Sequence, residues 1–170
     1  MFLNYIKEFF VKKSLKNNLH NVKNEVFTSK VQTIGLLIDE SNFWYSNQLT
    51  GELVLQGIAS ENIKVIAYRS NFNNKEKYLF PSFGKQHIDW KGKIKEVFLT
   101  EFIATEFDLL ISYYDSKSSV LMMITNLSKA KFKVGFSLID EKINRWMINT
   151  DLENYKLFIS ELFKYLKNIK

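Results

Sequence analysis

Residues 107–136, FDLLISYYDSKSSVLMMITNLSKAKFKVGF, combine a buried-strand pattern, a polar turn, a helical pattern and a second buried-strand pattern. A weaker copy of this unit spans residues 33–68, where TIGLLID and IKVIAY flank another helical segment. Apolar runs of this kind, without alternation, are typical of strands that are covered on both faces. Two strand–helix–strand units in series therefore predict an α/β domain with a mainly parallel sheet.

The predicted fold is a three-layer, Rossmann-like α/β domain, with a sheet of about four or five strands and helices on both faces. Strands are expected near 33–39, 63–70, 107–111, 130–136 and 143–149. Helices are expected over 43–59, 93–105, from about 119 to 127, and from about 150 to the end. Residues 71–92 contain the only proline, Pro81, and are expected to form a long irregular connection.

Short polar residues before each helical pattern are expected to cap the helices. These caps are Ser41 or Asn42 for the first helix, one of Ser116, Ser118 and Ser119 for the helix within 107–136, and Thr150 with Glu153 as a capping box for the last. Gly57 is expected to end the first helix. The inward-facing residues of the 93–105 helix are predicted to be Val97, Phe98, Phe102 and Ile103.

The composition favours one globular domain. The chain has 170 residues, of which 46% are hydrophobic, which suffices for one core but not for two ordinary domains. We expect a single α/β domain over 31–170, preceded by a distinct segment over 1–30. There is no cysteine, which excludes disulfides, thiolate metal sites and a cysteine nucleophile, and which fits a cytoplasmic location.

The first thirty residues form a basic, amphipathic pattern. Phe2, Ile6 and Phe9 recur at helical spacing. The opposite side carries Lys7, Lys12, Lys13 and Lys16. Six lysines against two glutamates give this segment +4 of the chain's net charge of +6. Its apolar run is too short and interrupted for a membrane span or a signal peptide, so it is expected either to dock on the domain or to bind a surface.

Polar side chains follow the predicted strands at their carboxyl ends. In open parallel sheets, ligands bind in the crevice beyond these ends, where helix N-termini also point. The candidate ligand-binding residues are Asp39, Asn42, Arg69, Asp115, Ser116, Lys117 and Ser118. The alternative is that these residues serve only as turns and caps. Asp39 and Asp115 form a carboxylate pair that could hold Mg²⁺ or act as acid and base, but no third partner is apparent.

The motifs of several large enzyme classes are missing from the sequence. There is no glycine-rich phosphate loop and no G-x-S-x-G elbow. The two histidines, His20 and His87, are far apart, and the interpretation favoured for each is a solvated side chain. The sequence therefore predicts no catalytic residue, no metal ligand and no cofactor. The aromatic residues expected in the core or at its rim, with base or sugar stacking as the alternative, are Trp44, Tyr45, Tyr68, Tyr113 and Tyr114.

Residues 107–136, followed by NRWMINTDLENYKLFISELFKYLKNI at 144–169, resemble a small uncharacterised bacterial family of stand-alone α/β proteins. This resemblance implies the fold and brings no catalytic residues. The strand–turn–helix–strand pattern is also distantly similar to the N-terminal half of heptosyltransferase-type glycosyltransferases. Those enzymes bind the sugar nucleotide mainly in a second half that has no counterpart in this sequence, so the similarity implies shared topology alone.

The leading functional hypothesis is a non-enzymatic cytoplasmic protein whose lysine-rich segment binds a polyanion, namely RNA or the ribosome. Of the 24 basic residues, only Arg69 and Arg145 are arginine, and codon drift in an AT-rich genome would also produce this bias. The second hypothesis is an enzyme or sensor that binds a nucleotide or sugar-phosphate in the strand-end crevice. The third is a protein-interaction module or membrane-peripheral protein that uses its N-terminal helix. The sequence indicates no oligomeric state.

Overall fold

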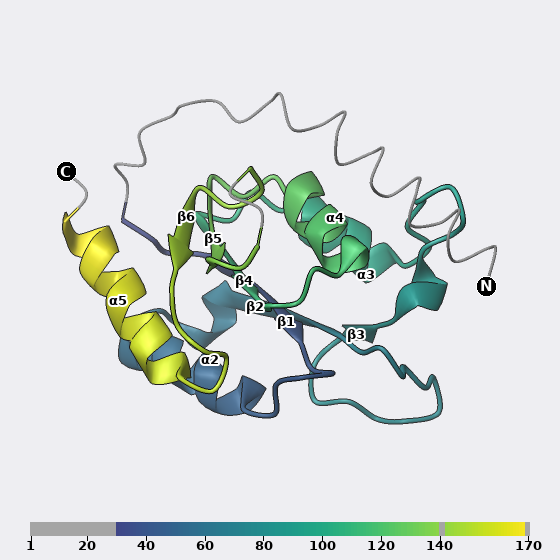
Figure 1. Ribbon diagram of the computed structural model, residues 1–170, viewed down its shortest axis with the longest axis horizontal. Helices are drawn as coiled ribbons and strands as arrows, with labels where there is room; N and C mark the ends of the chain where they lie inside the picture. Colours follow the sequence, from purple (N-terminus) through teal and green to yellow (C-terminus); the bar gives the residue numbers. More distant parts are fainter. Residues whose placement is uncertain (1–29, 140–141, 169–170) are drawn as a thin grey trace.

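The computed structural model describes residues 30–139 and 142–168, which build one six-stranded sheet with helices on both faces (Figure 1). The strands are β1 (Ile34–Asp39), β2 (Ile63–Tyr68), β3 (Ser82–Phe83), β4 (Leu109–Tyr113), β5 (Phe132–Phe136) and β6 (Trp146–Ile148). The helices are α2 (Ser46–Leu55), α3 (Val97–Ala104), α4 (Ser119–Leu127) and α5 (Tyr155–Asn168), with short 3-10 turns η2 (Ser60–Asn62) and η3 (Lys85–His87). The predicted α/β class is confirmed.

All neighbouring strands are parallel, in the order β3-β2-β1-β4-β5-β6. The chain moves outward from β1 to β2 and β3, then crosses back to β4 on the other side of β1. This is the strand order of Rossmann-like sheets, and its switch point lies between β1 and β4. The sheet has six strands rather than four or five, because the two-residue β3 lies within the connection that was expected to be irregular.

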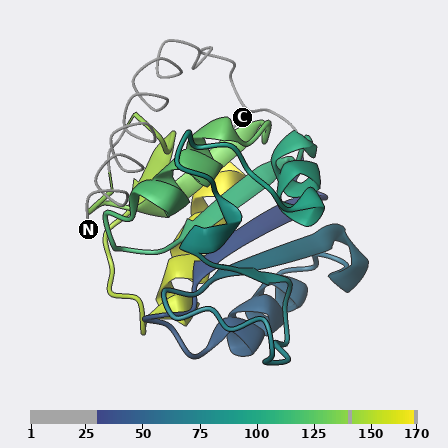
Figure 2. The same cartoon turned by 90° about the vertical axis from the view of Figure 1, so that its right-hand side faces the viewer.

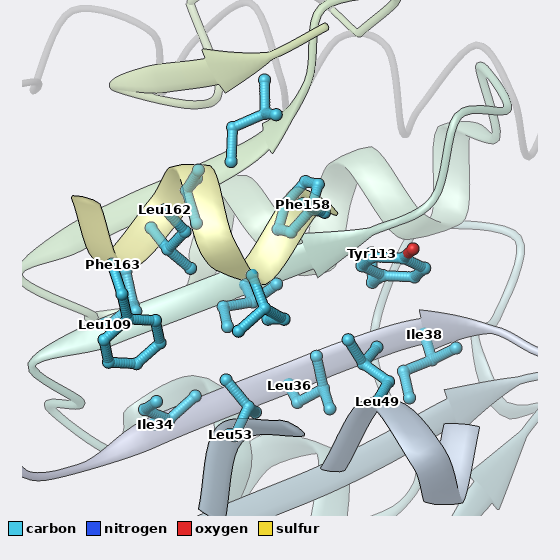
Figure 3. Packing of buried hydrophobic residues seen from close by; sticks show 14 of the residues in the cluster. Ile34, Leu36, Ile38, Leu49, Leu53, Leu109, Tyr113, Phe158, Leu162 and Phe163 are labelled. Carbon is cyan, nitrogen blue, oxygen red and sulfur yellow. The ribbon is translucent and has the colours of Figure 1, made fainter. Parts of the chain in front are cut away.

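Helices lie on either side of the sheet (Figure 2), and an apolar cluster fills the space between the sheet and the helices on each face. Helices α2 and α5 contact each other and cover one face, while α3 and α4 cover the other. Figure 3 shows part of one of these clusters, to which Leu36 of β1, Tyr113 of β4 and Phe158 of α5 all belong. All six residues of β1 are buried, which is why its sequence is apolar without alternation.

The amino end of β4 is fixed by one aspartate. Asp108 accepts hydrogen bonds at 3.0 Å from the backbone N–H groups of Gln32 and Thr33. It also accepts from the hydroxyl of Thr33 at 3.1 Å and from the Lys131 ammonium at 2.8 Å. Burial alone would raise its pKa, but these donors lower the pKa of Asp108 to about 2. Asp108 thus joins the segments that precede β1, β4 and β5.

A close approach explains the glycine of β1. A Cβ atom on Gly35 would lie 2.6 Å from the ring of Phe107. The ring of Phe107 is buried and packs at 5.0 Å from that of Phe102, centroid to centroid. Glycine at this position therefore lets the segment before β4 pack onto the sheet.

Most corrections to the predicted elements concern helix ends. Helix α2 begins at Ser46, after Tyr45, so Ser41 and Asn42 do not cap it. Its predicted end is confirmed by Gly57, which has a φ of 92°. Ser118 precedes α4 as predicted, but its side chain makes no capping hydrogen bond. Helix α5 begins at Tyr155, which is too late for Thr150 and Glu153 to form its capping box.

Helix α3 is shorter than predicted and rotated about its axis. It begins at Val97, and this residue is 68% exposed rather than buried. Leu99 and Phe102 are the buried residues of this helix, and Phe98 and Ile103 pack at the edge of the core. Within 30–139 and 142–168, no helix has the length and apolar character that crossing a bilayer requires.

Candidate functional site

Asp39, the last residue of β1, is the centre of a hydrogen-bonded group at the switch point. Its carboxylate accepts from the backbone N–H of Ser41 at 3.0 Å and from the side-chain amide of Asn42 at 3.2 Å. It also accepts from the hydroxyl of Ser116, across the switch point, at 3.0 Å. Asp39 is only 3% exposed. One buried carboxylate therefore connects the β1–α2 loop to the β4–α4 loop.

Tyr68 ends β2 directly beside Asp39. Burial and the nearby Asp39 carboxylate raise the pKa of Tyr68 to about 12, while a hydrogen bond with Ser118 acts in the opposite direction. The phenol is therefore protonated at physiological pH. The Ser118 side chain makes no capping bond, so this residue leaves the first N–H groups of α4 without a side-chain cap.

Asp115 follows β4 and is the second carboxylate of this edge. Burial raises its pKa, and the carboxylates of Asp39, Glu153 and Asp151 raise it further. No lysine or arginine within the described ranges forms an ion pair with Asp39 or Asp115. The buried Asp39 carboxylate and the partly buried Asp115 carboxylate therefore repel each other without a neutralising cation among the described residues, which is an energetically costly arrangement.

Arg69 belongs to a different group at the end of β2. Its guanidinium forms an ion pair with Glu40 and lies 4.2 Å from the ring centroid of Tyr78. Its Nε is buried and has no hydrogen-bond partner. Lys117 is exposed on the β4–α4 loop. Of the seven predicted residues, Asp39, Asn42 and Ser116 are in direct contact and Asp115 and Ser118 lie beside them, whereas Arg69 pairs elsewhere.

We call Asp39, Asn42, Tyr68, Asp115, Ser116 and Ser118 the strand-end cluster. The sequence-based prediction did not include Tyr68 in this cluster. It also missed the negative charges that Asp151 and Glu153 place near Asp115. Tyr68 could have been found from the pairing of β1 with β2. Two parallel strands of equal length that begin together also end together, which places Tyr68 beside Asp39. Glu153 was assigned to a helix cap and Asp151 to the helix that follows it, which obscured their position near the end of β4.

Two aromatic residues behave differently from the others. Tyr68, Tyr113 and Tyr114 are buried, as expected. Trp44 is 78% exposed in the β1–α2 loop, at the same edge as the strand-end cluster. Tyr45 is 45% exposed and stacks on Tyr155, with 5.9 Å between ring centroids.

Several predicted residues require separate comment. Lys7, Lys12, Lys13, Lys16 and His20 lie outside the described residues. His87 is partly buried, and its Nδ1 accepts a hydrogen bond from the N–H of Gly84 at 3.1 Å, so it is not simply a solvated side chain. Across 30–139 and 142–168, no three histidine or acidic side chains converge in a way that could hold a metal ion.

The sequence matches a family model described as "Family of unknown function (DUF6913)" over residues 7–169. The chain therefore belongs to this family, and the expectation of an uncharacterised family is confirmed. Comparison with curated proteins gave no significant match, and comparison with solved structures gave none either.

Proposed function

We propose that this protein binds a small, neutral, hydroxyl-rich molecule, such as a sugar or a nucleoside, at the strand-end cluster. The observation that carries the proposal is the pair of carboxylates, Asp39 and Asp115, at the switch point of a parallel sheet, where no lysine or arginine of residues 30–139 and 142–168 neutralises them. Ligands of such sheets bind beyond the carboxyl ends of the strands at this point. A bound ligand that donates hydrogen bonds would offset the cost of the unneutralised carboxylates.

The charges favour hydroxyl groups over phosphates. Carboxylates only accept hydrogen bonds, and in dinucleotide-binding sheets an acidic residue in this region accepts from a ribose hydroxyl. Asp115 and its neighbours Asp151 and Glu153 would repel a phosphate. The uncapped first turn of α4 supplies N–H donors, so the cluster suits a group that both donates and accepts. Within the sequence-based hypothesis of a nucleotide or sugar-phosphate, the sugar is the favoured part.

An exposed aromatic side chain supports the same class of ligand. Trp44 lies in the loop that follows Asp39 and is 78% exposed. Aromatic rings with one apolar face and a polar rim are common where a ligand is partly apolar and partly wet, as sugars and nucleosides are. The distant similarity to the N-terminal half of heptosyltransferases extends to topology alone and assigns no transferase activity.

The test is a thermal-shift and calorimetry screen of sugars, nucleosides and their phosphates. We expect at least one unphosphorylated compound to bind, and Asp115→Asn to weaken its binding at least about tenfold. The matched control is Glu106→Gln, which removes the same charge before β4, at the opposite edge of the sheet. Binding only of phosphorylated compounds, or equal binding by both variants, would contradict the proposal.

Binding of a polyanion through the N-terminal segment is a second candidate function. The observation in its favour is the net charge of +4 over residues 1–30. If the lysines neutralise phosphates, replacing Lys7, Lys12, Lys13 and Lys16 by glutamine should abolish binding of labelled poly(U) at low salt. If the variant still binds poly(U), these lysines are not the polyanion-binding site. A salt-resistant protein partner or binding to anionic vesicles would instead support the interaction-module or membrane-peripheral hypothesis.

A further inference from the structure

A groove of about 440 Å³ runs along the outer edge of β2, away from the strand-end cluster. The edge of β2 forms its floor, including Lys64 and Val65. Phe98, Glu101 and Phe102 of α3 line one wall, and Pro81 closes one end. The groove exists because β3 is only two residues long and pairs with Ala67 and Tyr68 alone.

The open part of this edge presents unpaired backbone groups. Ala67 N–H donates to the carbonyl of Pro81 at 3.0 Å, and Arg69 N–H donates to that of Phe83 at 2.8 Å. Alternate residues of a strand point their backbone groups the same way, so the N–H and C=O of Val65 also face the groove. Proline has no N–H with which to continue the ladder. No described residue forms a hydrogen bond with Val65 on this side.

We propose that this groove binds an extended peptide segment of a partner protein, which adds a short strand to the β2 edge. The backbone groups of Val65 select an extended chain, since strand addition satisfies them through main-chain hydrogen bonds. Ile63–Ile66 leaves room for about four paired residues. Alternate side chains of the peptide pack against Phe98 and Phe102 on the α3 side of the sheet.

Charge complementarity defines the peptide further. Lys64 is two residues before Ile66, whose side chain belongs to the layer under α3 and α4, so Lys64 points to that same side. Lys64 and Glu101 are both exposed at the groove. The partner therefore carries an acidic residue beside Lys64, apolar residues next to it, and no acidic residue beside Glu101. A second copy of this chain is a less favourable occupant of the groove. Antiparallel pairing of the two β2 edges would bring β3 of each copy against η2 of the other.

The test uses two labelled synthetic peptides, TETVTVT and its charge-swapped form TKTVTVT, and fluorescence anisotropy with the full chain. We expect saturable binding of the acidic peptide, weakened at least about fivefold in Lys64→Glu, whereas the same variant gains affinity for the basic peptide. Lys129→Glu, an exposed charge reversal just before β5, is the matched control and should leave both affinities unchanged. Thermal melts verify that both variants are folded.

A second arm tests strand addition without altering the protein. N-methylation of alternate peptide amides removes the donors on one edge of the strand. Methylation of one alternate set should abolish binding, and methylation of the other set should not. The proposal is overturned if the acidic peptide does not bind at millimolar protein, if both methylated peptides bind equally, or if concentration-dependent dimerisation of the chain alone occupies the edge.

Discussion

Both ends of the parallel strands, which we call the amino edge and the carboxyl edge of the sheet, hold a partly buried carboxylate. The surroundings shift the pKa values of these two carboxylates in opposite directions. At the amino edge, Asp108 receives donors from Gln32, Thr33 and Lys131, and its pKa is lowered to about 2. At the carboxyl edge, burial raises the pKa of Asp115, and the charge of the Asp39 carboxylate raises it further. The difference shows that the lowered pKa of Asp108 follows from its structural role, which is to join the segments that precede β1, β4 and β5. The raised pKa of Asp115 has no such structural explanation, and carboxylates with a shifted pKa and no structural role are typical of ligand sites.

Loss of Asp108 tests the structural half of this comparison and should have the largest effect. We expect Asp108→Asn to lower the free energy of unfolding by about 2 kcal/mol at neutral pH, because an amide cannot satisfy the same donors. A carboxylate with a lowered pKa stabilises the fold above its unfolded pKa, and this contribution is lost as the pH falls from about 4 to 2. Urea denaturation at neutral and acidic pH measures both effects.

The control for this prediction is Lys131→Met. The Lys131 side chain is 53% exposed, so loss of its ion pair should cost much less than loss of the Asp108 carboxylate. Equal losses in the two variants would mean that the ion pair, rather than the backbone donors, stabilises the amino edge.

Lys133 adds a partly buried positive charge to this comparison. Burial lowers its pKa to about 8, although the carbonyls of Thr125 and Asn126, near the end of α4, accept from its ammonium at 2.8 and 3.1 Å. The unfolded state then binds more protons than the folded state between pH about 8 and 10, so stability should rise with pH in this window. We expect a gain of about 1–2 kcal/mol between pH 7.5 and 9.5 in the wild type and none in Lys133→Met.

Parallel pH profiles of the wild type and Lys133→Met would contradict this assignment. They would mean that the helix carbonyls compensate fully for the burial of the ammonium group. The comparison of the two carboxylate edges would be unaffected, since neither Asp108 nor Asp115 contacts Lys133.

Asp115→Asn tests the functional half and should have the smallest effect on stability. A carboxyl group whose pKa is raised by folding lowers stability once the pH exceeds its unfolded pKa of about 4. Its replacement should therefore raise the free energy of unfolding slightly at neutral pH, by less than Asp108→Asn lowers it, with a smaller gain at acidic pH. Chemical denaturation beside Glu106→Gln measures this difference. A destabilised Asp115→Asn would instead assign Asp115 to the fold.

The fold was largely predictable because the strands of the central sheet are buried on both faces. The uninterrupted apolar runs around Leu36 and Ile111 follow directly from that burial. The two-residue β3 was not predictable, since Ser82 and Phe83 carry no periodic pattern. Helix starts were misplaced where polar residues serve other partners: Asn42 donates to Asp39 rather than capping α2.

The candidate site was predictable in its position but not in its contacts. The rule that ligands bind at strand ends selected Asp39, Asn42, Ser116 and Asp115. It could not separate Arg69 from this group, because pairing with Glu40 depends on side-chain placement across neighbouring strands. The groove beside β2 left no signal in the sequence apart from Pro81, since it results from the early end of another strand.

The most direct test of the contrast between the two edges is an NMR titration of the aspartate side-chain carboxyl carbons in the full chain. Both Asp108 and Asp115 are read in one experiment, so each serves as the reference for the other. We predict that Asp108 titrates near 2 and that Asp115 titrates above the ordinary aspartate value of about 3.9. If Asp115 titrates at or below that value, the carboxyl edge carries no unneutralised charge and the argument for a ligand there fails.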